Sequence, residues 1–143
     1  MIIRESNDID IHDLSRLMTQ LGYPTTEEEM AIRYNKIKKD PHYLTFVAEV
    51  DDKIVGMVGL FKGLFYEKND ISIRIIAFVV DVQYRNLGIG KKLIKHVENW
   101  SRNQGALEIG LTSGKREERK AAHYFYKSLG YLDRNIGFIK VFD

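Results

Sequence analysis

Residues 85–92, which read RNLGIGKK, combine two glycines with three cationic side chains. They follow a long apolar run and precede apolar residues with helical spacing, so the glycines lie where a strand passes into a helix. A helix N-terminus presents unpaired N–H groups and a partial positive charge, and glycine lets a ligand approach the backbone. This turn could therefore bind phosphate or pyrophosphate. A tight strand-to-helix corner without a ligand would use the same glycines.

Two familiar phosphate-binding patterns do not fit this turn. A P-loop requires G-x-x-x-x-G-K-[S/T], and a dinucleotide-binding turn requires G-x-G-x-x-G. Here Gly90 is followed by Lys91, Lys92 and Leu93, so neither pattern is completed.

Composition narrows the chemistry. The chain has 143 residues, which predicts one domain over residues 1–143. It has no cysteine, which excludes disulfides, thiolate metal sites and a cysteine nucleophile, and its four histidines lack ligand spacing, so we expect no metal site. A net charge of +2 argues against a nucleic-acid partner. The sequence shows no signal-like start and no apolar window of ~20 residues, so we expect a cytoplasmic protein without a membrane partner.

The elements that must position the turn can be read from periodicity and turn residues. Asp51-Asp52 between two β-rich runs predicts a hairpin. The order of elements favours a mixed sheet covered by helices, in the α/β (more narrowly α+β) class, without the βαβ alternation of a doubly wound fold. The expected strands are 2–3, 43–50, 53–61, 70–82, 106–113 and 131–142, the last being one strand or a bent pair. The expected helices cover about 8–21, 26–40, 90–104 and 116–129.

Two segments carry a resemblance to a known family. Arg85 to Gly90 matches [R/Q]-x-x-G-x-[G/A], preceded by the apolar strand and Val80 to Tyr84. Residues 119–131 match N-x-x-A-x-x-F-Y-x-x-x-G-[F/Y], except that Arg119 stands in the asparagine position. With both motifs present in this order, the chain resembles the GNAT superfamily of acyl-CoA-dependent N-acyltransferases. The resemblance covers nearly the whole chain. The resemblance implies a mixed, mostly antiparallel sheet of six or seven strands covered by about four helices.

The resemblance also implies how acetyl-CoA would bind. The backbone of Phe78, Val79 and Val80 would pair with the pantetheine arm, and the Val80 N–H would polarise the thioester carbonyl. Arg119 would reach a phosphate, and Tyr126 would lie beside the sulfur as general acid for the departing thiolate. The pyrophosphate would be held by the turn, namely by Arg85, Asn86, Leu87, Gly88, Ile89, Gly90 and Lys91.

The implied reaction is transfer of an acetyl group to a primary amine through a tetrahedral intermediate. Without a thiol, direct attack by the amine is the simplest path. The acceptor, a small-molecule or peptide amine, would contact Tyr23, Tyr66 and Glu67, near Phe65. The general base is not identified by the sequence, where Arg74 takes the position of a glutamate used by some members. The carboxylate candidates are Glu49, Glu67 and Asp70, for each of which an ordinary surface charge is the favoured interpretation. His123 is a further candidate for assisting proton transfer.

Two other function classes stay open. One is a non-catalytic acyl-CoA-binding regulatory module, against which the presence of Tyr126 argues. The other is an RNA-contacting domain, against which the low net charge argues; it would use Lys91, Lys92, Lys95, Arg116 and Arg119. Separately, the apolar segment at residues 136–142 is typical of an exposed sheet edge and predicts a homodimer formed partly through it. The same residues would equally fit the core of a monomer.

Overall fold

The computed structural model describes residues 1–114 and 119–143. The chain forms two compact units, residues 1–110 and residues 111–143. The start of the predicted last helix, residues 116–118, lies outside the described residues.

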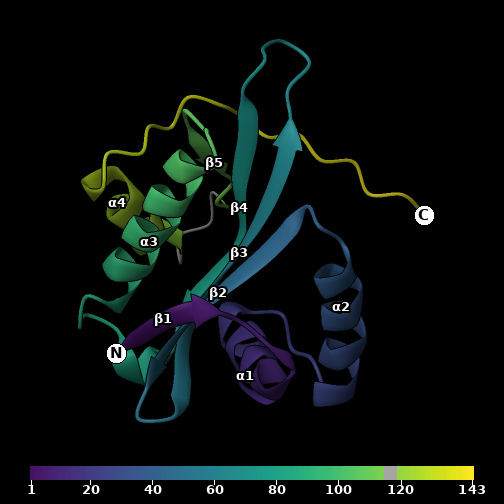
Figure 1. Ribbon diagram of the computed structural model, residues 1–143, viewed down its shortest axis with the longest axis vertical. Coiled ribbons are helices and arrows are strands. Elements are labelled where there is room, and N and C mark those ends of the chain that lie inside the picture. The colour runs from purple at the N-terminus through teal and green to yellow at the C-terminus, as the bar shows by residue number, and fades with distance from the viewer. Residues whose placement is uncertain (115–118) are drawn as a thin grey trace. The chain divides into compact units, whose positions relative to one another are not determined.

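The described residues form a five-stranded sheet in the order β1-β2-β3-β4-β5 (Figure 1). The pairings β1 with β2, β2 with β3 and β3 with β4 are antiparallel. The α+β class expected from the sequence is therefore confirmed. The strands are β1 (Ile2–Glu5), β2 (Tyr43–Val50), β3 (Lys53–Leu64), β4 (Ile71–Val80) and β5 (Ile109–Leu111).

The β2–β3 hairpin is where the sequence predicts it. Val50 pairs with Lys53, and the two connecting residues, Asp51 and Asp52, have φ angles of 49° and 63°. Two successive left-handed residues match the twist of the flanking strands, and aspartate tolerates this conformation better than most residues do. The turn chemistry thus sets the pairing of β2 with β3 next to the hairpin, up to the register shift at Ala48/Glu49.

Four helices accompany the sheet in the described residues. They are α1 (Ile11–Leu21), α2 (Glu27–Lys39), α3 (Ile89–Asn103) and α4 (Lys120–Ser128). α2 is capped by Thr26, whose side chain accepts a hydrogen bond from the Glu29 N–H at 3.1 Å. Its first turn is acidic and its last turn is basic, which suits the helix dipole.

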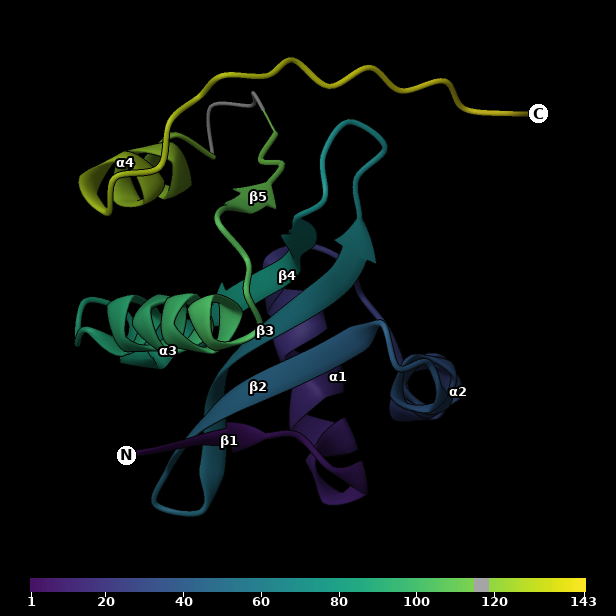
Figure 2. The ribbon, with the colours of Figure 1, turned by 45° about the horizontal axis from the view of Figure 1, so that its top comes forward.

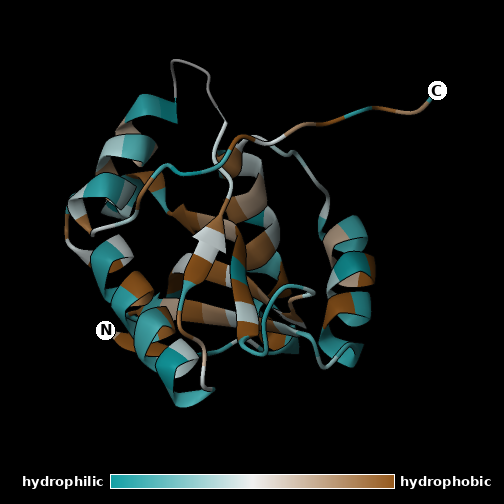
Figure 3. Ribbon diagram, turned by 90° about the horizontal axis from the view of Figure 1, so that it is seen from above, coloured by the Kyte–Doolittle hydropathy of each residue, from teal (hydrophilic) through white to brown (hydrophobic). Residues whose placement is uncertain are grey.

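In the first unit, α1 and α2 cover one face of the sheet and α3 covers the other (Figure 2). Alternation along β2 shows the two faces. Val47 packs in a cluster with Leu14 and Leu17 of α1. The residue before it, Phe46, points to the opposite face, where its ring lies 6.0 Å from that of Trp100 of α3, measured between ring centroids. The strands are coloured mostly as hydrophobic in Figure 3, as expected for a sheet buried on both faces.

Two of the expected strands differ from the structure. Residues 131–142 form no strand, so the prediction of six or seven strands is wrong for the described chain. The 106–113 run is also shorter than expected, with only Ile109–Leu111 in β5. The β-propensity of a residue reflects how well its side chain packs on a paired, half-buried strand. A segment that has no neighbouring strand is therefore not stabilised as a strand by residues of high β-propensity.

Among the described residues, no helix has the length and apolar composition needed to cross a membrane.

Candidate active site

The glycine-rich turn joins β4 to α3 through two left-handed residues, Asn86 (φ 64°) and Gly88 (φ 82°). Gly88 caps α3, and its carbonyl accepts the first intrahelical bond, from Lys92 N–H at 3.1 Å. The N–H groups of Ile89, Gly90 and Lys91 precede that bond, so they lack an intrahelical partner. The first turn of α3 has no acidic residue, and the Arg85, Lys91 and Lys92 side chains are exposed. This combination favours an anion.

At the end of β4, the backbone N–H and C=O of Val80 face away from β3. The Asp81 N–H donates to the Val55 carbonyl of β3 at 2.8 Å. Because backbone groups alternate between the two edges of a strand, the N–H and C=O of Val80 face the opposite edge. On that edge the Arg85 Nε donates to the Val80 carbonyl at 3.0 Å. Arg85 therefore ties the turn to the end of β4, beside the outward-facing Val80 N–H.

A cavity of about 650 Å³ lies between the first two helices and β4. Of the residues expected to bind an acceptor, Tyr23 lines it, whereas Tyr66 and Glu67 are exposed on the loop between β3 and β4 and are not part of its lining. The lining residues are Met18, Leu21, Gly22, Tyr23, Pro24, Arg33, Ile76 and Ala77.

Tyr126 and Arg119 belong to the second unit. Arg119 immediately precedes α4, and Tyr126 lies in its last turns with 8% of its surface exposed. The Tyr126 ring contacts Phe125 and Tyr131, at 5.5 and 6.0 Å between centroids. Burial raises the pKa of the Tyr126 phenol, and the Arg119 charge offsets only part of that effect. The phenol is therefore protonated at neutral pH.

Comparison with known proteins identifies the family. A model of the acetyltransferase (GNAT) family matches residues 10–131, which include the turn and the Tyr126 helix. The chain belongs to this family. The resemblance seen in the sequence is thus confirmed. GNAT acetyltransferases use acetyl-CoA and act on amine substrates.

Individual relatives agree with this membership. A GNAT family acetyltransferase from Staphylococcus aureus has 33% sequence identity and a TM-score of 0.85, over 99% of this chain and 98% of that one. Thialysine N-epsilon-acetyltransferase from Mus musculus is 26% identical over 92% of this chain and 84% of its own length. N-acetyltransferase 8 from Homo sapiens is 31% identical over 60% of this chain. The matched part spans only 37% of that longer protein.

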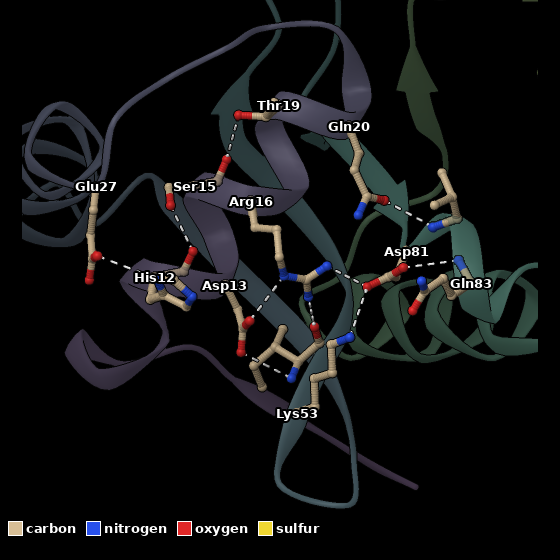
Figure 4. Close-up of polar contacts among 12 residues, drawn as sticks. His12, Asp13, Ser15, Arg16, Thr19, Gln20, Glu27, Lys53, Asp81 and Gln83 are labelled. Carbon is tan, nitrogen blue, oxygen red and sulfur yellow. Dashed lines mark hydrogen bonds and ion pairs between the residues drawn. The ribbon is translucent and has the colours of Figure 1, made fainter.

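A polar network that sequence reasoning missed lies beside the GNAT turn (Figure 4). Asp81, with 1% of its surface exposed, pairs with the Arg16 guanidinium of α1 and accepts from the Gln83 N–H at 3.0 Å. The Lys53 Nζ lies 3.6 Å from the same carboxylate. The Gln20 side chain accepts from the Val82 N–H at 2.9 Å. The network therefore connects α1 to the segment that leads into the turn.

The network also connects α1 to β3. Arg16 donates to the Ile54 carbonyl at 2.8 Å, and Asp13 accepts from the Ile54 N–H at 3.2 Å. Burial by itself would raise the pKa of Asp81, but the Gln83 N–H and the Arg16 charge together bring it below the ordinary value. Arg16 and Asp81 are 65 positions apart, and no local pattern marks them as partners.

Replacing Asp81 by asparagine is expected to lower the free energy of unfolding at neutral pH by roughly 1.5–3 kcal/mol, the range for hydrogen bonds to charged groups. The Asp81 pKa is lower in the folded than in the unfolded chain. Its contribution is therefore complete above the ordinary aspartate pKa of about 3.9, and it is lost as the pH falls below that value and through the lowered folded pKa. Urea unfolding across this range should show the gap between wild type and variant narrowing in acid.

The exposed hairpin substitution Asp52→Asn is the matched control and should leave the pH dependence unchanged. Asp10 also has a lowered pKa, since Arg4 and the Asn7 N–H outweigh its burial, so the variant keeps part of the acid sensitivity. A gap between Asp81→Asn and wild type that is constant at every pH would show that this carboxylate does not titrate as inferred.

The expected general-base candidates are dispersed. The Glu49 carboxylate accepts from Arg4 at 2.9 Å, Glu67 is exposed, and Asp70 is half-buried at the end of the β3–β4 loop. His123 is half-buried on α4 of the second unit. No group of three or more histidine, aspartate or glutamate side chains in the described part of the chain could hold a metal ion.

Proposed function

We propose that this chain, as a single N-acetyltransferase domain over residues 1–143, transfers an acetyl group from acetyl-CoA directly to a primary amine, through a tetrahedral intermediate. The observation that carries the proposal is the end of β4. There the outward-facing Val80 N–H lies next to a left-handed turn that opens onto unpaired N–H groups of α3. One site thus offers donors for both a pyrophosphate and a thioester carbonyl.

The residues of the turn suit acetyl-CoA, which would supply the activated acetyl group. The N–H groups of Ile89, Gly90 and Lys91 would hold the pyrophosphate, with Arg85 and Lys91 adding positive charge. The remaining turn residues, Asn86, Leu87 and Gly88, shape the approach. The backbone of Phe78, Val79 and Val80 would run beside the pantetheine arm. β5 has three residues and β4 has ten, so β5 can pair along only part of that edge.

Two groups would act on the reacting atoms. The Val80 N–H would stabilise negative charge as it develops on the thioester carbonyl oxygen. Tyr126, protonated at neutral pH, would donate its proton to the departing thiolate. Arg119 would contribute a phosphate contact in the same complex. The acceptor would approach along Tyr23, with Tyr66 and Glu67 contributing from the β3–β4 loop.

The decisive experiment measures CoA release from acetyl-CoA with a panel of amines that includes amino acids, polyamines and aminoglycosides. Mass spectrometry should identify the acetylated amine. We expect release that requires both substrates. Binding of acetyl-CoA without acetylation of any amine would favour the regulatory module instead, and absence of binding would reject the proposal.

We also propose a homodimer formed in part through residues 136–142. Five apolar side chains there have at least 67% of their surface exposed, namely Ile136, Phe138, Ile139, Val141 and Phe142. Such a segment is prone to pair with another chain. Light scattering at micromolar concentration should give about twice the chain mass of 16.6 kDa. The doubly substituted variant Phe138→Asp, Phe142→Asp should give the monomer mass, and a monomeric wild type would contradict the proposal.

A further inference from the structure

The cavity beside β4 has the properties of a small-molecule site. Its volume of about 650 Å³ lies within the usual range for ligand pockets, and most of its lining is apolar. Its walls come from the end of α1, from α2 and from Ile76 and Ala77 of β4. Ala77 is three residues before Val80, so the cavity reaches within about 10 Å of the proposed thioester position, at about 3.3 Å per strand residue.

The loop wall of this cavity is ordered by backbone interactions. Gly22 ends α1 with a φ of 111°, a left-handed conformation that glycine adopts at little cost. The next N–H, of Tyr23, donates to the Met18 carbonyl at 3.0 Å. This turn at the end of α1 brings Tyr23 and Pro24 to the cavity wall.

Among the described residues that line the cavity, Arg33 alone has a charged side chain. Its Nη1 donates to the Thr25 hydroxyl at 3.1 Å, and its Nη2 lies 3.6 Å from the Glu29 carboxylate, so both contacts hold the guanidinium at the rim. A guanidinium has five N–H donors in a planar fork, so these two contacts leave capacity for a ligand. About half of the side chain is exposed, which lets an entering ligand reach it.

We propose that this cavity binds the acceptor and that Arg33 recognises a carboxylate on it. The substrate class is then amino acids and related small amines that carry a carboxylate. This inference rests on the proposed acetyl transfer and goes further by naming the acceptor. The planar fork matches a carboxylate, and an apolar wall accommodates the carbon chain between the carboxylate and the amine.

The balance of charge at Arg33 disfavours acceptors that carry several positive charges or a phosphate group. Polyamines and aminoglycosides carry several positive charges, which Arg33 would repel at the rim of a cavity that has no other charged lining residue in the described chain. A phosphate group would bring nearly two negative charges against one cation that already has Glu29 beside it. A singly charged carboxylate is the anion that this balance accommodates best.

The test compares amino acids with their amides, in which a neutral carboxamide of similar shape replaces the carboxylate. We use lysine with lysinamide and β-alanine with β-alaninamide, and we measure kcat and KM for wild type, Arg33→Gln and Arg33→Lys. Wild type should prefer at least one acid over its amide by about 10-fold or more, mainly through KM. Arg33→Gln should lose that preference, with a larger rise of KM for the acid than for the amide. Arg33→Lys should restore part of it.

The control is Lys36→Gln, which removes an exposed cation of the same helix outside the cavity lining and should leave the preference unchanged. Acetylation of other amines, with equal use of acid and amide by wild type, would overturn the carboxylate assignment while leaving the proposed function intact. Calorimetry of the same acids and amides with each protein gives a readout without turnover. Equal dissociation constants for acid and amide, or for wild type and Arg33→Gln, would overturn the assignment as well.

Discussion

Tyr126→Phe is expected to lower kcat by about 10²-fold or more while leaving the affinity for acetyl-CoA nearly unchanged. The expulsion of CoA generates a thiolate, and a protonated phenol stabilises it more in the transition state than in the ground state. Burial raises the pKa of this phenol above its ordinary value of about 10, so it carries its proton at neutral pH. The substitution retains the ring that packs against Phe125 and Tyr131, so it removes the hydroxyl with little change in packing.

Tyr124→Phe is the matched control for this experiment. Tyr124 lies on the same helix two residues earlier, and 79% of its surface is exposed, so the identical change should leave kcat at the wild-type value. CoA release should be measured for both variants with the same amine. If both turn over like wild type, Tyr126 is not the general acid and its ring serves only to pack α4.

Gly90→Val is expected to weaken acetyl-CoA binding by more than ~100-fold, which calorimetry would record as a loss of detectable binding. Gly90 is the second residue of α3, among the N–H groups proposed to hold the pyrophosphate. A β-branched side chain there would block close approach of phosphate oxygens to the backbone. Valine is no worse than glycine within a helix, so the change should not unfold α3.

Asn103→Val provides the control at the other end of the same helix, where the side chain is exposed and far along the chain from the turn. It should bind acetyl-CoA like wild type. Circular dichroism should show that both variants are folded. A folded Gly90→Val protein with wild-type affinity would reject the turn as the pyrophosphate site.

Local features of this protein were determined by the sequence alone. The hairpin at Asp51-Asp52, the start of α2 at Thr26 and the strand-to-helix turn at Gly88 all depend on the conformational preferences and side-chain chemistry of adjacent residues. Such preferences act over a few positions, so they can be read from the chain. The two motifs that indicate the family can be read from the sequence for the same reason, because each lies within one short segment.

Tertiary structure decided the features that require distant residues to meet. The Val80 N–H faces outward because the register with β3 directs Asp81 toward Val55. Arg16 meets the Asp81 carboxylate only because α1 packs on the sheet beside the turn. Arg33 of α2 and Ile76 of β4 line one cavity because the fold brings these two elements together. Nothing in either segment of the sequence indicates the other as its neighbour. Residues 131–142 show the converse. Their apolar, β-prone side chains predict a strand, but a strand forms only where a neighbouring strand pairs with its backbone, and the described fold supplies none to them.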